Sequence, residues 1–346
     1  MNPLAEDLDA VLALTGDLWD DLRGARLFLT GGTGFFGCWL LETALWANDR
    51  LGLGLEIVAL TRDPAAFARK APPLTAQPAL TLWAGDVREF AFPEGRFTHV
   101  VHAATDSDTA KIVAEPLETL ETIVQGTRRV LDFAAQAGAK RVLLTSSGAV
   151  YGRQPPGVTH VSEDYAGAPD VRSAAASYGE GKRVSEMLGA IYARQHGLEV
   201  VLTRPFAFLG PYLPLGGHYA VGNFLGNGLR GEPLQIGGDG TPLRSYLYAS
   251  DLAVWLWTLL LRGQSLRPYN IGSEEALSIE DLARLVAAQF GGLPVEIARQ
   301  NVPGQASEQY VPSTARAQAE LGLRQTVSLG EALEKTIRWH QRGAYL

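Results

Sequence analysis

The feature that most constrains this chain is a glycine-rich turn over residues 31–37, Gly-Gly-Thr-Gly-Phe-Phe-Gly. It follows an apolar run at 26–30 that predicts a buried strand, and it opens a helix predicted over 36–47. Glycines at such a junction let a pyrophosphate approach the backbone, and the helix N-terminus offers it unpaired N–H groups. The turn therefore predicts a dinucleotide site, although glycines also serve ordinary tight turns. Its predicted cofactor-binding residues are Gly31, Gly34, Phe35, Phe36 and Gly37.

Short apolar runs that predict strands alternate with helical segments along much of the chain. The further predicted strands are 56–60, 80–84, 99–103, 141–146, 199–204 and 269–271, and the predicted helices are 116–137, 177–196, 251–262, 278–290 and 329–342. Strands that alternate with helices predict an α/β fold with a doubly wound parallel sheet of the Rossmann type. Ligands of such a sheet lie at the carboxyl ends of its strands.

The chain divides into three segments that differ in composition and in their pattern of predicted elements. Residues 1–24 predict an N-terminal helical extension, with a helix over 4–22, and residues 25–204 a dinucleotide-binding Rossmann domain. Many glycines and prolines follow residue 204, as expected of a loop-rich lobe that wraps a ligand. We therefore expect 205–346 to form mainly a smaller substrate-binding lobe, with 246–272 returning to the Rossmann domain.

Composition excludes several classes of function. The 346 residues are 46% hydrophobic and carry a net charge of −7 without a basic run, so we expect neither a nucleic-acid nor a membrane partner. The most apolar stretch, 247–261, contains Asp251 and is too short to span a bilayer. Cys38 is the only cysteine, and the chain starts without the pattern of a signal peptide, which together favour the cytoplasm. The six histidines lack metal-ligand spacing, so no metal is expected.

Tyr178 and Lys182 stand four residues apart at the start of the predicted helix 177–196, so both project from one face. An ammonium beside a phenol lowers the pKa of the phenol, which lets tyrosine exchange a proton near neutral pH. We therefore predict Tyr178 as a catalytic acid/base, with Lys182 tuning it and holding the nicotinamide ribose. On spacing alone, a chance pair on a helix stays open.

Hydroxyl residues end the predicted strand 141–146. Ser146 and Ser147 would lie at the carboxyl edge of the sheet, where Ser147 can orient a reacting hydroxyl or carbonyl. Taken alone, these serines could also be strand-end caps. Their order and separation from Tyr178 favour a shared site.

The second predicted strand ends in Thr61 and Arg62, where an NAD-binding chain usually places an acid for the ribose 2′-hydroxyl. A guanidinium at Arg62 can pair with the 2′-phosphate of NADP. The predicted cofactor is NAD(P), with NADP slightly favoured over NAD. The alternative is that Arg62 is a solvated loop cation and that Asp63 reaches the ribose.

In sequence, the motifs GGTGFFG, GDV, HAA, TSSGAVYG, YGEGK, RPFAFLGPY and GDGTPLRSYLYASD follow one another between residues 31 and 251. With this order the chain resembles the extended short-chain dehydrogenases that act on nucleotide sugars, over about residues 26–335. The resemblance implies an NAD(P) cofactor, a nucleotide-diphosphate sugar substrate and the catalytic trio Tyr178, Lys182 and Ser147. It adds the cofactor-binding residues Asp86, Val87, His102, Ala103, Ala104, Lys182 and Pro205. It adds the substrate-binding residues Ser146, Ser147, Asn223, Phe224 and Arg244, with Arg244 gripping the diphosphate.

Two departures from the family pattern bear on the reaction. The resemblance implies Asp-Glu after the catalytic hydroxyl in dehydratases, and a glutamate at the second place in decarboxylases, whereas this chain has Gly148 and Ala149. The family's Arg-x-Phe-Asn is Arg-Pro-Phe-Ala at 204–207, so one expected polar contact to the sugar is missing.

Without those carboxylates, the pattern predicts hydride transfer at the sugar C4, first as an NDP-sugar epimerase. An NADPH-dependent NDP-4-keto-6-deoxysugar 4-ketoreductase is the alternative. A 4,6-dehydratase or a decarboxylase is less favoured. A non-catalytic dinucleotide sensor on the same fold is also less favoured, because it would not need the catalytic trio.

The predicted helices 116–137 and 177–196 carry apolar residues on more than one face, which suggests a second packing partner. In similar enzymes these helices pair with their symmetry mates, so we expect a homodimer. The alternative is a monomer in which the N-terminal helix covers this surface.

Overall fold

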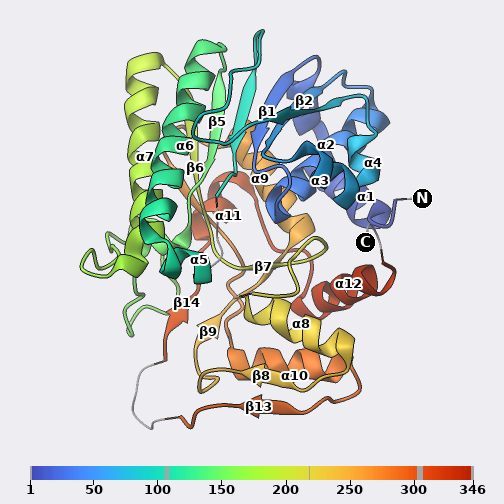
Figure 1. Ribbon diagram of the computed structural model, residues 1–346, viewed down its shortest axis with the longest axis vertical. Coiled ribbons are helices and arrows are strands. Elements are labelled where there is room, and N and C mark those ends of the chain that lie inside the picture. The colour runs from blue at the N-terminus through green and yellow to red at the C-terminus, as the bar shows by residue number, and fades with distance from the viewer. Residues whose placement is uncertain (1, 106–108, 218, 302–306, 344–346) are drawn as a thin grey trace.

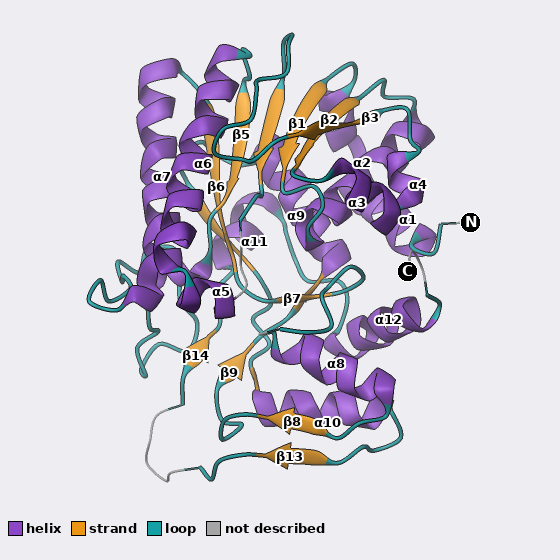
Figure 2. Ribbon diagram, in the orientation of Figure 1, coloured by secondary structure: helices purple, strands orange, loops and turns teal. Residues whose placement is uncertain are grey.

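The computed structural model describes residues 2–105, 109–217, 219–301 and 307–343. Its main sheet is parallel, as the alternation of strands and helices predicts, and has the order β11-β6-β5-β4-β1-β2-β3 (Figures 1 and 2). The strands are β1 (Arg26–Thr30), β2 (Glu56–Thr61), β3 (Leu80–Ala84), β4 (His99–His102), β5 (Arg141–Thr145), β6 (Glu199–Pro205) and β11 (Pro268–Ile271). The strand order reverses between β1 and β4, which is where a doubly wound sheet binds its ligand.

Successive side chains of each strand point to opposite faces, and each face is covered by helices. Leu27 and Leu29 of β1 pack with α2 (Phe35–Leu51) and α9 (Ala249–Arg262). Phe28 between them packs on the other face, where α6 (Pro116–Gln136) and α7 (Ser177–His196) lie together at the left of Figure 1. The continuous apolar strands of the sequence are thus buried on both faces.

The N-terminal extension differs from the single helix predicted over 4–22. It forms α1 (Ala5–Thr15) and then a 3₁₀ helix, η1 (Gly16–Leu22), because Gly16 turns the chain with φ of +49°. Leu8 and Val11 of α1 are buried in the core that also holds α2 and α9. The extension therefore covers the face opposite α6 and α7, and the alternative that it shields those two helices is wrong.

Shorter helices complete the Rossmann part. They are α3 (Pro64–Lys70), α4 (Pro72–Thr75), α5 (Thr109–Ala114), α11 (Ala315–Leu321) and the 3₁₀ turns η2 (Gly148–Tyr151) and η3 (Ala174–Ala176). Asp63 caps α3 by accepting a hydrogen bond from the Ala66 N–H at 2.8 Å. Strand β11 is hydrogen-bonded to β6, so the chain re-enters the main sheet after its first excursion into the lobe.

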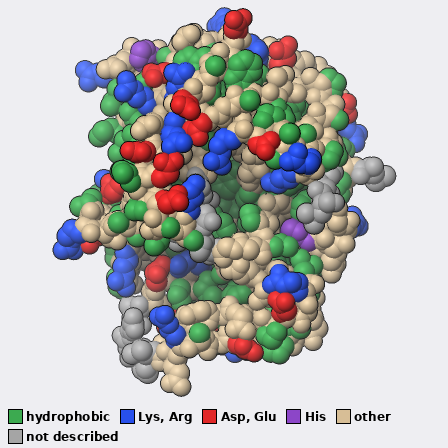
Figure 3. Space-filling model, in the orientation of Figure 1, with side chains coloured by type: hydrophobic (Ala, Val, Ile, Leu, Met, Phe, Trp, Pro, Cys, Tyr) green, Lys and Arg blue, Asp and Glu red, His purple; other side chains and the backbone are tan. Residues whose placement is uncertain are grey.

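The smaller lobe lies below the sheet in Figure 1 and has its own apolar core, which includes Phe224, Leu225 and Val286. Its helices are α8 (Ala220–Arg230), α10 (Ile279–Gln289) and α12 (Leu329–Gln341). Its strands are β7 (Phe208–Leu209), β8 (Leu234–Ile236), β9 (Leu243–Arg244), β10 (Leu247–Tyr248), β12 (Leu277–Ser278), β13 (Val295–Ile297) and β14 (Gln309–Tyr310). The surface is hollowed between the lobe and the Rossmann part (Figure 3).

Candidate active site

A hollow of about 290 Å³ lies at the carboxyl ends of β1 to β4. Seven of the predicted cofactor residues line it: Gly31, Gly34, Arg62, Asp86, Val87, Ala103 and Ala104. Segments more than 70 residues apart in sequence thus meet at one edge of the sheet.

Three of the four glycines of the turn, Gly31, Gly34 and Gly37, differ in whether the protein itself would tolerate a side chain there. Gly31 has φ of +74°, and a Cβ there would lie 2.5 Å from the Ala103 carbonyl carbon. A Cβ at Gly37 would lie 2.1 Å from the Gly31 oxygen. The protein itself therefore excludes side chains at both positions. Gly34 is different, because its nearest neighbour to an added Cβ is 3.4 Å away, and its φ of −83° suits any residue.

Phe35 and Phe36 follow the turn, at the first turn of α2. Phe35 packs against the cores of both the sheet and the lobe, and the ring of Phe36 meets that of Phe208 at 5.1 Å. Their side chains thus join the two parts of the molecule. Their N–H groups, at the start of the helix, are the groups suited to a pyrophosphate.

Asp86 is held by a residue that sequence reasoning missed. The Arg88 guanidinium donates to the Asp86 carboxylate at 2.9 Å and to Glu118 at 2.7 Å, and all three side chains line the hollow. The hydrogen bond from Arg88 lowers the pKa of Asp86. Lys111 and Arg62 also line the hollow. Together with Arg88, they give the walls of the hollow three basic residues.

Two of the predicted cofactor residues, His102 and Pro205, do not line the hollow. The His102 side chain is buried and shares hydrogen bonds with Thr30 (2.8 Å) and Thr127 (3.2 Å), so it is occupied within the protein. Burial lowers the pKa of His102 to about 3, which keeps the ring neutral. Pro205 is buried at the end of β6, in register with Ile271. We correct the prediction for His102, because a contact to the cofactor could come only from its main chain.

The catalytic trio comes together beside this hollow. The Lys182 Nζ lies 5.8 Å from the centre of the Tyr178 ring and donates to the Thr145 carbonyl at 2.7 Å. Ser147 follows β5, and its Oγ accepts from the Ala149 N–H at 3.1 Å. Burial raises the pKa of the Tyr178 phenol, and the neighbouring Ser147 side chain opposes this rise only partly.

Burial acts on Lys182 in the opposite direction. It lowers the pKa of the ammonium to about 7, and the charge of Glu186 opposes this only partly. Glu186 is itself paired with the Arg204 guanidinium at 2.7 and 2.9 Å. The lysine can thus change its charge near neutral pH, which suits a residue that tunes a proton-exchanging phenol.

Tyr310 is a second phenol at the site, and sequence reasoning missed it. It lies on β14 in the lobe, where burial raises its pKa to about 12 and the neighbouring Ser147 side chain opposes this rise only partly. A Cβ at Gly148 would lie 2.7 Å from the Tyr310 Oη and 2.8 Å from the Phe206 ring. The place of a dehydratase-type carboxylate is therefore filled by two aromatic residues.

The predicted substrate residues differ in whether their side chains are already paired or buried within the protein. Ser146 is buried, and among the described residues its Oγ has no hydrogen-bond partner. Arg244 pairs with Glu308 at 2.6 Å, and the Asn223 amide donates to the Gly217 carbonyl at 2.7 Å. The side chain of Phe224 is 2% exposed within the lobe core, so the prediction that it contacts substrate is wrong for the side chain.

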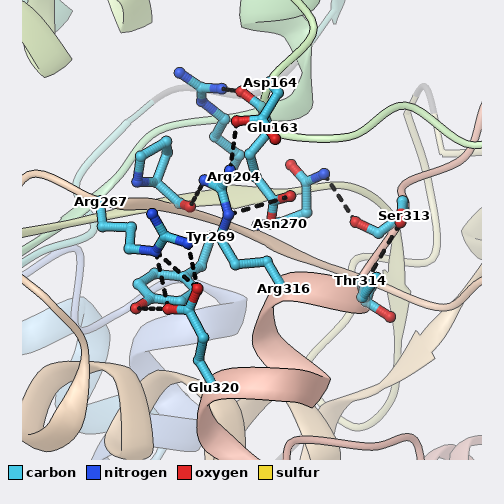
Figure 4. Close-up of polar contacts among 12 residues, drawn as sticks. Glu163, Asp164, Arg204, Arg267, Tyr269, Asn270, Ser313, Thr314, Arg316 and Glu320 are labelled. Carbon is cyan, nitrogen blue, oxygen red and sulfur yellow. Dashed lines mark hydrogen bonds and ion pairs between the residues drawn. The ribbon is translucent and has the colours of Figure 1, made fainter.

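A polar network fixes the strands behind the site (Figure 4). The Asn270 amide donates to the carbonyls of Val161 (2.9 Å) and Ser313 (3.0 Å) and accepts from the Tyr151 hydroxyl at 2.7 Å. Arg316 pairs with Asp164 at 2.6 Å. The network joins the segment after β5 to the segment after β14.

The described residues hold no group of three or more His, Cys, Asp or Glu that could bind a metal ion. In the same part of the chain, no helix has the length and apolar character to cross a bilayer.

The sequence and the fold both match known proteins. A model of the NAD dependent epimerase/dehydratase family matches residues 27–272. UDP-glucuronic acid decarboxylase 6 of Arabidopsis thaliana is 32% identical over 309 residues, which are 89% of this chain and 86% of the relative. UDP-glucuronic acid decarboxylase 1 of Xenopus tropicalis is 31% identical over 92% of this chain and 72% of its own length.

Among solved structures, the dTDP-glucose 4,6-dehydratase DesIV of Streptomyces venezuelae, with NAD and TYD bound, matches with a TM-score of 0.79 and 27% identity. The match covers 92% of this chain and 97% of that one. The UDP-glucose 4-epimerase of Thermus thermophilus, in complex with NAD, matches with a TM-score of 0.75 and 26% identity, over 92% and 99% of the two chains.

Proposed function

The chain belongs to the NAD-dependent epimerase/dehydratase family, and from this premise we propose that it transfers hydride at C4 of a nucleotide-activated sugar, as an epimerase. One observation carries the proposal. Tyr178, Lys182 and Ser147 are assembled beside the cofactor hollow, while Gly148 and Ala149 offer no carboxylate for a further elimination. This arrangement suits reversible oxidation of a sugar hydroxyl.

The protein residues would handle the proton. Ser147 orients the C4 oxygen by hydrogen bonding, and Tyr178 takes its proton as the carbonyl forms and returns it later. Lys182, when charged, stabilises the phenolate and can reach the nicotinamide ribose. NAD(P), held at the glycine turn and along the hollow lined by Asp86 and Val87, would accept and return the hydride.

A decarboxylase is the second candidate, and the curated relatives favour it, since those reported above are UDP-glucuronic acid decarboxylases. Residue 149 argues against it. The family resemblance implies a glutamate there in decarboxylases, and this chain has Ala149. Alanine can neither donate nor accept a proton. The residue that exchanges a proton after the loss of CO₂ would therefore have to lie elsewhere in the chain.

Net reduction of a 4-keto-6-deoxy sugar is the alternative within the same chemistry. It would use NADPH, for which the exposed Arg62 at the rim of the hollow is the candidate 2′-phosphate partner. We propose NAD(P) as the cofactor, with NADP slightly favoured. For the substrate we propose Arg244 as the residue that meets the diphosphate, after exchanging its ion pair with Glu308.

We further propose a homodimer built on α6 and α7. Leu117 of α6 and Met187 and Ile191 of α7 are exposed apolar residues, and the N-terminal extension lies on the other face of the sheet. A buried free cysteine, Cys38, suits a reducing compartment, and we place the protein in the cytoplasm.

The test is a panel of UDP- and dTDP-activated sugars, incubated with and without added NADPH. The proposal predicts a C4 epimer without net cofactor consumption. Consumption of NADPH with a 4-keto sugar would select the ketoreductase. Release of CO₂ from UDP-glucuronic acid would establish the decarboxylase and overturn the proposal.

A further inference from the structure

We propose that Arg88 is a positioning residue that selects adenine as the base of the dinucleotide, because it holds the Asp86 carboxylate as an acceptor for the amino group of adenine. This role rests on the proposed function, which takes NAD(P) as the cofactor. Arg88 follows β3 and bonds both Asp86 and Glu118 of α6, so it joins two walls of the hollow.

The order of the strands indicates which half of the cofactor lies near Arg88. The catalytic trio lies beside β5 and the glycine turn follows β1, whereas Asp86 and Arg88 follow β3 (Figure 2). Strands β5 and β3 lie on opposite sides of β1 in the sheet. A dinucleotide with its pyrophosphate at the turn and its nicotinamide at the trio must therefore extend its adenosine toward Asp86.

Arg88 leaves the Asp86 carboxylate one position for a ligand. A carboxylate has about four lone-pair positions that can accept hydrogen bonds. The main-chain N–H and the Nε of Arg88 both donate to Oδ1 at 2.9 Å, and its Nη2 donates to Oδ2 at 3.3 Å. With no further donor to this carboxylate among the described residues, one position on Oδ2 remains, and a single N–H of an amino group fills it. Because the two-pronged contact also fixes the rotation of the carboxylate, this position has a defined direction.

The charge of Arg88 keeps Asp86 in the form that only accepts hydrogen bonds. Its Nη1 donates to Glu118 at 2.7 Å, so one guanidinium lies between two carboxylates that would otherwise repel each other. Hydrogen bonding to Arg88 lowers the pKa of Asp86, and the carboxylate therefore stays ionised at neutral pH. An ionised carboxylate cannot donate a hydrogen bond. It therefore suits the amino group of adenine and repels the carbonyl oxygen that hypoxanthine has at the same position.

Other residues that line the hollow also suit a purine. Leu60 and Val87 offer apolar side chains on which a flat ring can pack. Thr119, next to Glu118 on α6, is 3% exposed, and its hydroxyl has no hydrogen-bond partner among the described residues. A buried hydroxyl without a partner is costly, and a ring nitrogen of the base could supply that partner. The hollow thus combines apolar walls with polar groups that lack a full set of protein partners.

Calorimetric binding of NAD⁺ and of nicotinamide hypoxanthine dinucleotide tests this role without turnover. The two ligands differ only in the base, where a carbonyl group replaces the amino group. The wild type should bind NAD⁺ at least about tenfold more tightly, the scale of a hydrogen bond to a charged group. In Arg88→Met, which keeps the apolar part of the side chain, this ratio should fall below about threefold. Arg129→Met is the matched control and should keep the wild-type ratio, since Arg129 bonds the Phe90 carbonyl and does not line the hollow.

If binding requires the 2′-phosphate, NADP⁺ and its hypoxanthine analogue form the equivalent pair of ligands. Asp86→Asn then separates positioning from a merely structural role. Because Arg88 donates N–H groups, it should hold the amide oxygen of the asparagine and leave the amide N–H groups facing the base. This variant should therefore prefer the hypoxanthine dinucleotide, and Arg88→Met in the same background should abolish that preference.

Two results would overturn the role of Arg88: a wild-type ratio near one, or an unchanged ratio in Arg88→Met. A purely structural Arg88 would lower the melting temperature, or both affinities equally, and would leave the ratio as it is. If the wild type binds neither dinucleotide, the cofactor, the proposed function and this role fail together. If it binds NAD⁺ with the expected ratio but converts no nucleotide sugar, the proposed function fails while the role of Arg88 stands.

Discussion

The Lys182 Nζ lies 5.8 Å from the centre of the Tyr178 ring, one helical turn away on α7. Burial lowers the pKa of the lysine to about 7 and raises that of the tyrosine, so it favours the neutral form of both. The fold therefore holds an ionisable pair in an environment that opposes its charge. Such a cost is expected where function, rather than stability, requires the residues.

Replacement of Lys182 by methionine should change how stability depends on pH. The folded-state pKa of about 7 is below the ordinary value of 10.5, so the unfolded chain binds one more proton between these two values. Stability of the wild type should rise with pH through this window, and the penalty from Lys182 is complete below pH 7. In Lys182→Met, urea unfolding between pH 7 and 10 should show a smaller rise. The exposed Lys140→Met is the control, and an unchanged slope in Lys182→Met would contradict the burial argument.

Gly34→Ala should weaken the cofactor without weakening the fold. The nearest atom to an added Cβ is 3.4 Å away and φ is −83°, so the protein can accept the methyl group. A dinucleotide lying against the turn could not accept the methyl group, because the cofactor approaches the backbone there closely. We expect NAD(P) affinity, measured by calorimetry, to fall about tenfold or more, with an unchanged melting temperature. Gly37→Ala, in contrast, should lower the melting temperature, since its Cβ would lie 2.1 Å from the Gly31 oxygen. Full affinity in Gly34→Ala would place the cofactor elsewhere.

Arg62→Ala should discriminate between the two cofactors. If the guanidinium pairs with a 2′-phosphate, the Kd for NADPH should rise about 10- to 100-fold, the scale of a charged hydrogen bond, and that for NADH should change little. Arg69→Ala, an exposed arginine on the neighbouring helix α3, serves as control. Equal changes for the two cofactors would show that Arg62 is a general surface cation and would favour NAD.

Met187→Glu should disrupt the proposed dimer. Met187 is 62% exposed on α7, whereas Leu188 packs partly against the core, so a charge at 187 leaves the fold intact. Light scattering at micromolar concentration should show a dimer for the wild type and a monomer for the variant. The control is Leu285→Glu, because Leu285 is also exposed but lies on α10 in the lobe. A monomeric wild type would refute the dimer.

Much of this architecture is readable from local sequence signals. The strands are continuous apolar runs, buried on both faces, and Gly31 and Gly37 mark a turn where the backbone packs too closely for side chains. Tyr178 and Lys182 are adjacent on one helix face, so their spacing alone predicts that they meet. The helix predicted over 4–22 was only partly right, because the positive φ at Gly16 ends α1 early.

The missed residues depend on contacts between distant segments. Tyr310 lies on a strand of two residues, and its position follows from the pairing of that strand with Arg244 and of the next residues with Val161, rather than from any local pattern. Arg88 could be placed at the hollow only once Glu118 of α6 was known to lie beside it. His102 and Phe224 show a different limit of sequence motifs. A motif predicts that a residue lies near a site, but it does not show where the side chain points.

The central claim is that Tyr178 exchanges the proton that accompanies hydride transfer at C4, and one measurement tests it most directly. Purified protein loaded with NAD⁺ or NADP⁺ is mixed with each UDP- or dTDP-sugar of the panel, and reduced nicotinamide is followed at 340 nm in wild type and in Tyr178→Phe. We predict transient reduction with at least one sugar in the wild type, slowed when C4 carries deuterium. In Tyr178→Phe it should be slower by about 10²-fold or more, with unchanged cofactor affinity. Near-normal reduction in Tyr178→Phe, or none in the wild type with any nucleotide sugar, would contradict the account.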